Sequence, residues 1–123
     1  MPKVVHFEIP AIDAPRAIEF YAQAFGWTST DYGPAPSGYW ICECGTPEEP
    51  GVNGAIMTRI GEGQPVVTVL KVDSIDAAIA AVEAAGGEIV VPKFEVPFVG
   101  WKAFFKDTEG NIMGMAEFSQ GDV

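Results

Sequence analysis

The sequence has few of the residues on which metal, disulfide and nucleic-acid sites depend. Its 123 residues include one histidine, two cysteines and seven basic residues, against seventeen acidic ones. Two cysteines cannot supply the four thiolates of a structural zinc site, and a catalytic zinc site needs about three His or carboxylate ligands. The formal net charge of −10 would repel a polyphosphate backbone, so we do not expect a nucleic-acid partner.

Long apolar runs are also missing. No stretch reaches the roughly 18 to 20 apolar residues that span a bilayer, and Met1-Pro2-Lys3 leads into mixed sequence rather than the apolar segment of a signal peptide. Cys42 and Cys44 are two apart in a strand-like run, so they share one face with a geometry unsuited to a disulfide. We therefore expect a cytoplasmic protein with reduced thiols and no membrane partner.

The hydrophobic content of 48% is enough for one domain with a hydrophobic core. The sequence predicts two helices in this domain. The first covers about residues 14 to 25, with Asp13 as its N-cap and Gly26 at its end. The second runs from about residue 75 to 85, after Ser74. Strand-like runs occupy residues 4–9, 39–44, 54–57, 66–72, 88–91, 101–105 and 111–118, with a weaker one from residue 27.

These elements occur twice in the same order. An offset of 61 residues (66 minus 5) pairs Val5 with Val66 and Gly26 with Gly87, and Gly54–Met57 parallels Gly110–Met113. We predict the α+β class: two βαβββ modules, about 1–60 and 64–120, within a single domain of residues 1–123. A curled mixed sheet around a central cleft is the arrangement that we expect.

The sequence resembles the vicinal-oxygen-chelate superfamily, which contains glyoxalases, bleomycin-resistance proteins and extradiol dioxygenases. The segments that carry the resemblance are His6-Phe7-Glu8-Ile9-Pro10, Asp13 with Arg16-Ala17-Ile18-Glu19-Phe20-Tyr21, Phe25-Gly26-Trp27, and Asp107-Thr108-Glu109-Gly110-Asn111-Ile112. The resemblance covers essentially the full length. It implies the glyoxalase/bleomycin-resistance-like fold and is silent on the reaction.

The resemblance also gives four positions for the ligands of a divalent metal, on the first and last strand of each module. They fall on His6, Val67, Thr58 and Gly114, of which only His6 is a ligand-type residue. We therefore expect no cofactor and disfavour a divalent metal. Glu8 or Glu117 could still supply a carboxylate, although strand parity turns Glu117 away from Gly114.

His6 and Glu8 are the candidate catalytic and ligand-binding residues. The resemblance places His6 on the cavity face, where an imidazole with an ordinary pKa of roughly 6.5 hydrogen-bonds a ligand or transfers a proton. Glu8 either orients His6 or acts as its acid–base partner. The alternatives are that His6 is a hydrogen-bonded structural histidine and that Glu8 is a rim glutamate in water.

Other ligand-binding residues are expected along the cleft. Large aromatic side chains suit a planar ligand, although roughly half of such residues would be ordinary core. The loops 45–53 and 96–100 would either cover the cleft or simply connect strands. Beyond His6 and Glu8, the expected lining set is Trp40, Ile56, Thr58, Val67, Val69, Trp101, Phe104, Ile112 and Gly114, with Tyr39 as a further aromatic wall.

Three functions remain open at this point. The leading prediction is a metal-independent protein that binds a small apolar or aromatic molecule. The second is a glyoxalase-like lyase, isomerase or dioxygenase with an atypical metal site, or with His6 as a base without metal. The third is a protein-interaction module, and the resemblance also implies a homodimer.

Overall fold

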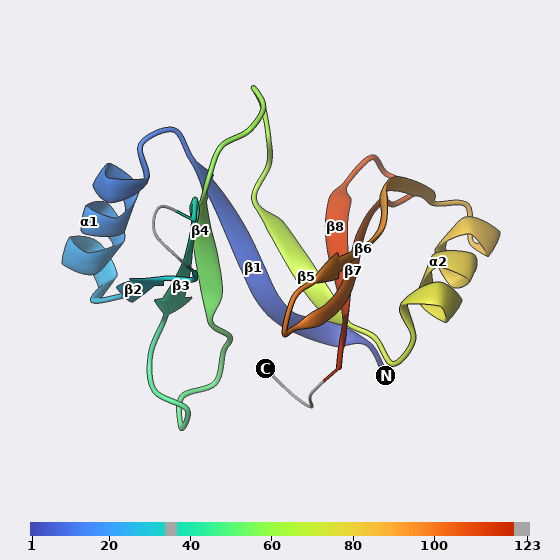
Figure 1. The fold of residues 1–123 in the computed structure, drawn as a ribbon, viewed down its shortest axis with the longest axis horizontal. Coiled ribbons are helices and arrows are strands. Elements are labelled where there is room, and N and C mark those ends of the chain that lie inside the picture. Colours follow the sequence, from blue (N-terminus) through green and yellow to red (C-terminus); the bar gives the residue numbers. More distant parts are fainter. Residues whose placement is uncertain (34–36, 120–123) are drawn as a thin grey trace. The chain divides into compact units, whose positions relative to one another are not determined.

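The computed structural model describes residues 1–33 and 37–119, and it contains two helices and eight strands in these residues. Residues 34–36, in the middle of the turn that the Gly/Pro-rich sequence predicts at residues 33–38, lie outside the described part. Figure 1 shows the elements in chain order. Their bounds are β1 Lys3–Ala11, α1 Ala14–Phe25, β2 Thr28–Asp31, β3 Tyr39–Glu43, β4 Gly54–Thr58, β5 Val67–Lys71, α2 Ile75–Ala84, β6 Glu88–Val96, β7 Gly100–Lys106 and β8 Ile112–Phe118.

The chain forms two compact units. The first module comprises residues 6–66, and the second module comprises the described residues from 67 onward together with residues 1–5. Each follows the βαβββ order, so the predicted α+β class and its repeated module are confirmed. The cleft expected between the modules stays a prediction.

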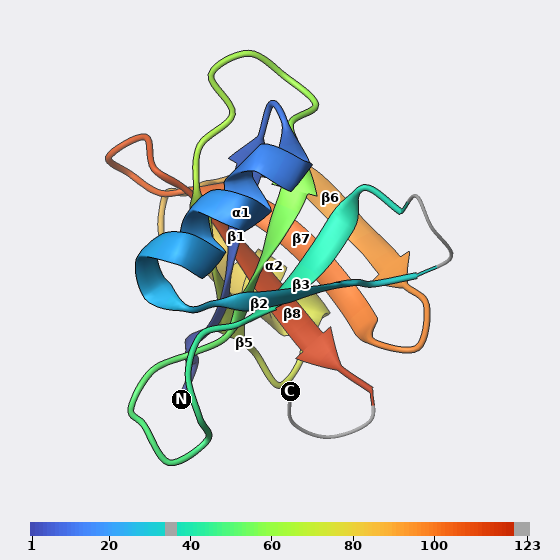
Figure 2. The ribbon, with the colours of Figure 1, turned by 90° about the vertical axis from the view of Figure 1, so that its left-hand side faces the viewer.

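In the first module the strand order is β2-β3-β4-β1. The β1 and β4 strands pair in parallel, whereas β3 pairs antiparallel with β4 and with β2. Figure 2 shows α1 in front of this sheet. The core beneath α1 is centred on the buried residues Ala11, Ala14, Cys42 and Ile56.

The second module repeats this topology with the order β5-β8-β7-β6. The β5 and β8 strands pair in parallel, and β7 pairs antiparallel with β8 and β6. Its helix α2 packs over a core of Val72, Ile75, Ala103 and Met115. Each module therefore buries one sheet face under its own helix.

Capping explains where the helices begin and end. The Asp13 side chain accepts a hydrogen bond from the Arg16 backbone N–H at 3.1 Å, and Gly26 ends α1 in the left-handed conformation (φ 75°). Ser74 caps α2 by accepting from the backbone N–H of Ala77. The second helix ends at Ala84, one residue earlier than predicted.

One strand extends well beyond its predicted length. The sequence indicates a strand over residues 88–91, but β6 continues to Val96. Pro92 lies within β6 and is tolerated there, because β6 is an edge strand that needs no donor on its outer side. Register shifts between Ile89 and Phe94 accommodate the proline within the pairing to β7.

Candidate functional site

Strand alternation separates two groups of side chains in the first module. Ile9, Ile56 and Trp40 are paired neighbours on β1, β4 and β3, and all three pack in the core beneath α1. Residues one position away on each strand point to the other side of the sheet. We call this side the distal face of the first module, and it carries His6 and Glu8 of β1 and Tyr39 of β3.

Three side chains on this distal face form a chain of short hydrogen bonds. The Tyr39 hydroxyl donates to Oε2 of Glu8 at 2.6 Å, and Nε2 of His6 lies 2.8 Å from the same hydroxyl oxygen. The direct distance between His6 Nε2 and Glu8 Oε2 is 3.9 Å. Tyr39 therefore joins the imidazole to the carboxylate, and we name these residues the His6–Tyr39–Glu8 chain.

The proton count fixes the direction of this chain. A phenol has one proton, and that of Tyr39 is donated to Glu8. The contact with His6 then requires Nε2 to carry the proton and to donate it to the Tyr39 oxygen. The imidazole thus stands at the donor end and the carboxylate at the acceptor end.

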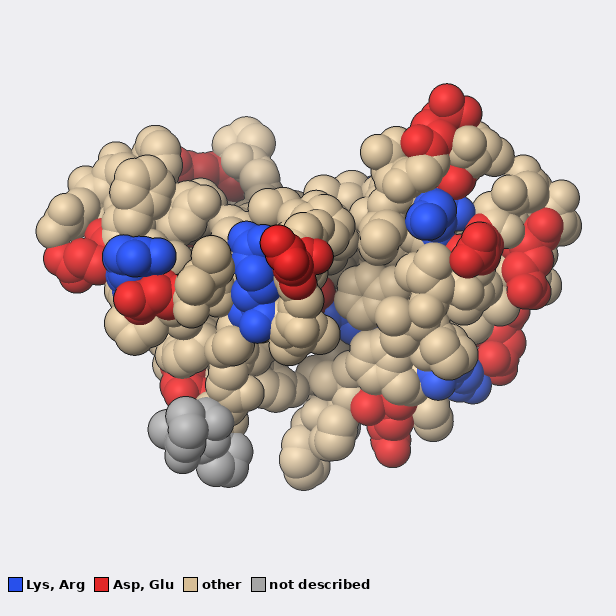
Figure 3. Space-filling view, turned by 90° about the horizontal axis from the view of Figure 1, so that it is seen from above, with Lys and Arg blue, Asp and Glu red and all other residues tan. Residues whose placement is uncertain are grey.

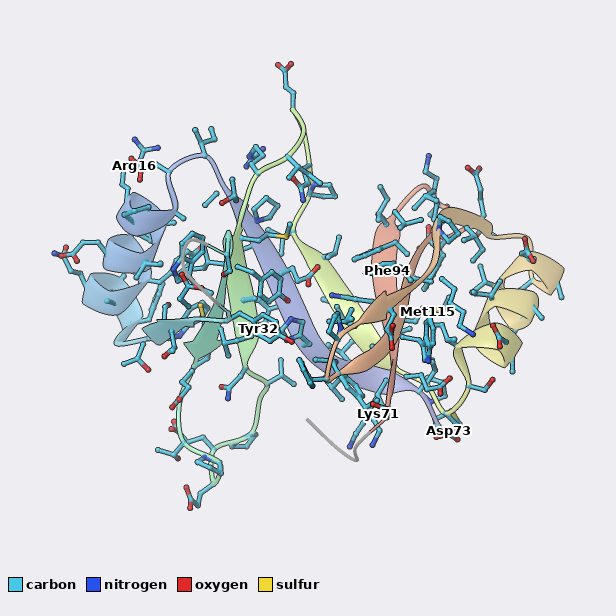
Figure 4. The ribbon with its side chains drawn as sticks, in the orientation of Figure 1. Arg16, Tyr32, Lys71, Asp73, Phe94 and Met115 are labelled. Atoms are coloured by element: carbon cyan, nitrogen blue, oxygen red, sulfur yellow. The ribbon has the colours of Figure 1, made fainter. Side chains whose placement is uncertain are left out.

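Tyr39 remains protonated in this environment. Burial raises the pKa of Tyr39 far above its ordinary value, and the neighbouring Glu8 carboxylate raises it further by charge and by the hydrogen bond. The ring of Tyr32, labelled in Figure 4, meets the Tyr39 ring edge-on at a centroid distance of 5.8 Å. The phenol is therefore held in place as a neutral donor.

Burial decides between the two interpretations of Glu8. Its exposed fraction is 4%, so the alternative of a rim glutamate in water is wrong. A buried carboxylate is costly unless hydrogen bonds satisfy it, and the Tyr39 hydroxyl provides one such bond. His6 is partly buried, with a side-chain exposure of 16%.

The structure does not bring the other first-module candidates to His6. Trp40 and Ile56 lie in the core beneath α1, on the face opposite Glu8. Thr58 pairs with Ala11, another residue of that core, and is therefore on the same face as Ile56. The sequence predicts Tyr39 only as an aromatic wall, whereas its hydroxyl is the centre of the site.

The second module has its own distal face. Val69, Gly114 and Phe104 are paired neighbours on β5, β8 and β7, turned away from the core beneath α2. A Cβ atom on Gly114 would lie 3.1 Å from the Phe104 ring and 3.2 Å from Val69, so these two side chains close over the glycine. Val67 and Ile112 share this face by alternation, whereas Trp101 packs on the α2 side.

The strand register revises one of the four metal-ligand positions. Glu8 pairs with Ala55, and Val69, which is 61 residues after Glu8, pairs with Gly114. The first-module counterpart of Gly114 is therefore Ala55 rather than Thr58. Glu117 is also committed elsewhere, because its Oε1 accepts from the Ile75 backbone N–H at 2.8 Å, at the start of α2.

The donor set at these positions does not fit a divalent metal. It contains one imidazole, whose Nε2 is hydrogen-bonded to Tyr39, together with Val67, Gly114 and Ala55, which have no ligating side chain. Within residues 1–33 and 37–119, no three His, Cys, Asp or Glu side chains are grouped so that they could hold a metal ion.

The cysteines are free thiols in different surroundings. Cys42 is fully buried beneath α1, and its Sγ lies 3.2 Å from the Ser29 hydroxyl. Cys44 is partly exposed, and burial together with the neighbouring Cys42 raises the pKa of its thiol. Neither thiol is part of the His6–Tyr39–Glu8 chain.

Comparison with known proteins identifies the family. The family model of the Glyoxalase/Bleomycin resistance protein/Dioxygenase superfamily matches residues 3–114. Proteins named "Putative glyoxylase CFP32" from Mycobacterium bovis and Mycobacterium tuberculosis are 28% identical over 117 residues. That match covers 88% of this chain but only 42% of the length of these relatives.

Solved structures share the fold at low sequence identity. The hypothetical protein BH1468 from Bacillus halodurans has a TM-score of 0.72 at 16% identity, with 99% of this chain and 98% of that chain covered. Methylmalonyl-CoA epimerase from Mycobacterium tuberculosis has a TM-score of 0.68 at 16% identity, with 94% and 87% covered. The chain belongs to the glyoxalase/bleomycin resistance protein/dioxygenase superfamily.

Proposed function

We propose that this protein binds a small, largely apolar or aromatic molecule on the distal face of its first module, without a divalent metal. The observation that carries the proposal is the His6–Tyr39–Glu8 chain. A binding site of this kind is mostly apolar and fixes its ligand through a few convergent polar groups. Ala55, Met57 and Ile41 share the face with the chain and provide the apolar surroundings.

The polar chain supports ligand binding better than a purely structural role. A buried carboxylate and a partly buried imidazole are costly to keep inside an apolar face, and replacing them with apolar residues would often be neutral or stabilising. The second module has Val67 and Val69 at the corresponding positions, 61 residues later, and folds with the same topology. The fold therefore does not need the polar pair.

An enzymatic role is the second candidate, and the same chain favours it. An imidazole joined to a carboxylate by a phenol is suited to moving a proton to or from a bound substrate. The curated relatives carry the name "Putative glyoxylase CFP32", and one solved structure with the same fold is a methylmalonyl-CoA epimerase. This candidate is a lyase or isomerase, or a dioxygenase that recruits a metal in a way different from the four positions above.

The remaining expectations belong to the same proposal. We expect a cytoplasmic protein that forms a homodimer. Among the described residues no helix is long and apolar enough to cross a membrane. A module that only binds another protein is the third candidate and would show no affinity for small molecules.

Native mass spectrometry of the purified protein tests the metal and ligand parts together. The protein would be measured as purified and after incubation with zinc, nickel, manganese and iron(II). We expect metal-free protein, with a retained organic mass where a ligand copurifies. One tightly held metal per chain that is lost in His6→Ala would overturn the metal-independent proposal.

Amide chemical shifts locate the site. We expect members of a panel of aromatic alcohols and ketones to shift the amide resonances of His6, Glu8 and Tyr39 in a ¹H–¹⁵N spectrum. In His6→Ala these shifts should shrink, while the free energy of unfolding should fall by only about 0.5–1.5 kcal/mol, the contribution of the single hydrogen bond to Tyr39. A panel with no effect on these resonances would argue against the binding site.

Solvent deuterium separates a binder from an enzyme. Carbonyl compounds, including methylmalonyl-CoA, would be incubated with the protein in D₂O and followed for loss of the proton next to the carbonyl. Exchange above the buffer rate that disappears in Tyr39→Phe would establish the enzymatic role. Absence of exchange for every compound that binds would favour the binding protein.

A further inference from the structure

A hollow lies on the α1 side of the first module, away from the His6–Tyr39–Glu8 chain. It has a volume of about 390 Å³, in the range of small-molecule pockets. The end of β1, the start of α1 and the residue after β4 form its wall. The lining residues are Ile9, Pro10, Ala11, Ile12, Asp13, Arg16, Ala17, Phe20, Tyr21 and Arg59.

Both arginines of the chain line this hollow. Arginines are rare in this sequence, and basic residues of any kind number seven against seventeen acidic ones. Figure 3 shows lysine and arginine as isolated patches among tan and red surface. Two guanidinium groups at one hollow are therefore an unusual concentration of positive charge for this protein.

Neither guanidinium is committed to a partner within the described residues. The Nε atom of Arg59 is buried and has no hydrogen-bond partner, and the ion pairs of the described residues involve neither arginine. Arg59 is partly exposed as a residue, so its buried Nε is the part of the group that lacks an acceptor; such an atom is rare in native proteins and is consistent with a ligand that binds there. Arg16, labelled in Figure 4, stands at the beginning of α1 on the wall of the same hollow.

The charge and the lining define the chemistry of the occupant. Asp13 contributes one negative charge and the two arginines two positive charges, which leaves the hollow with a single excess positive charge. The guanidinium fork of arginine matches the two oxygens of a carboxylate. Exposed apolar surface adjoins it, because Ile12 is 80% exposed and Phe20 57% exposed.

We propose that this hollow binds a monocarboxylate with an apolar body, its carboxylate held by Arg59 and Arg16 and its body against Ile12 and Phe20. Asp13 selects against a phosphate dianion, since its carboxylate already caps α1 and would repel a second charge. The site is separate from the one proposed above and does not depend on it.

Calorimetry and NMR with 3-phenylpropionate, and with its neutral amide 3-phenylpropanamide, test this site. We expect 3-phenylpropionate to bind and to shift the amide resonances of Ile12, Arg16 and Arg59, and the amide to bind at least tenfold more weakly. Arg59→Gln should weaken 3-phenylpropionate about tenfold or more. Arg59→Lys keeps the positive charge but lacks the guanidinium fork, so its affinity for 3-phenylpropionate should lie between those of the unchanged protein and Arg59→Gln.

Matched variants keep the result interpretable. Lys93→Gln removes a positive charge that pairs with Asp76 in the second module, and it should leave 3-phenylpropionate binding unchanged. Tyr39→Phe should also leave it unchanged, which separates this site from the His6–Tyr39–Glu8 chain. If Arg59→Gln does not fold, as judged by its circular dichroism, Arg16→Gln takes its place with the same expected loss.

Three results would overturn the proposal. Equal binding of acid and amide would mean that the arginines do not recognise the carboxylate. Displacement of 3-phenylpropionate by equimolar inorganic phosphate would identify a phosphate site instead. Shifts confined to His6, Glu8 and Tyr39 would place the acid on the distal face.

Discussion

The hydroxyl of Tyr39 should contribute more to stability than any other tyrosine hydroxyl of the first module, and Tyr39→Phe tests this. The substitution keeps the ring and removes the donor to Glu8 and the acceptor for His6. A hydrogen bond to a charged group contributes about 1.5–3 kcal/mol and a neutral one about 0.5–1.5 kcal/mol. Because Glu8 is 4% exposed, water cannot readily replace the lost donor. We expect a loss of about 2 to 4 kcal/mol in the free energy of unfolding.

Urea unfolding followed by tryptophan fluorescence measures this loss. With an m-value of about 2 kcal/mol/M, the midpoint should fall by about 1 to 2 M. Tyr21→Phe is the matched control, because Tyr21 stacks on Trp27 beneath α1 at a centroid distance of 4.8 Å, and its hydroxyl has no hydrogen bond to a described residue. That variant should change stability by less than about 0.5 kcal/mol.

A double-mutant cycle assigns the effect to the contact itself. Tyr39→Phe and Glu8→Gln should be non-additive by about 1 to 2 kcal/mol, because Glu8→Gln replaces the charged acceptor of the hydrogen bond that Tyr39→Phe removes. The reasoning would be refuted if Tyr39→Phe and Tyr21→Phe had equal effects. Additive losses would mean that the Tyr39–Glu8 contact contributes little.

Two further predictions concern packing and thiol chemistry. Gly54→Ala should cost about 2 to 3 kcal/mol, because the new Cβ would lie 2.5 Å from the Phe7 ring, whereas Gly61→Ala meets nothing within 4 Å and should be nearly neutral in the same urea assay. In the native protein a thiol reagent should label Cys44 but not the fully buried Cys42. Since burial raises the pKa of Cys44, its labelling rate should reach half-maximum above pH 9.0, and a midpoint below that value, or equal labelling of both thiols, would contradict the placement.

The local elements could be predicted because their signals are local. Asp13 and Gly26 bound α1, and the predicted range of residues 14–25 matches the observed helix. The alternation of β1 likewise puts His6 and Glu8 on one face, as predicted from their spacing. The predicted strand over residues 88–91 stops short of Pro92, and the sequence does not show that β6 lies at a sheet edge, where a proline is tolerated.

The centre of the site could not be predicted in the same way. Tyr39 meets Glu8 only because β3 pairs with β4 and β4 pairs with β1 in a particular register. The sequence of one strand does not determine its register with a strand distant in the chain. The same register turns Trp40 to the core beneath α1 rather than to His6. Strand alternation alone could have limited the choice. Tyr39 and Trp40 are adjacent on one strand, so only one of the two side chains could share a sheet face with Glu8.

The single proton of the Tyr39 hydroxyl gives the chain of hydrogen bonds the properties of a proton wire. A proton taken up at Nδ1 of His6 makes an imidazolium, whose Nε2 proton can pass to the phenol oxygen while the phenol proton passes to Glu8. The imidazole then returns to its neutral form, and the carboxylate is neutralised at the far end. No heavy atom has to move, because both donor–acceptor distances are already below 3 Å. A group that exchanges a proton with the imidazole thereby sets the charge of a carboxylate that water hardly reaches.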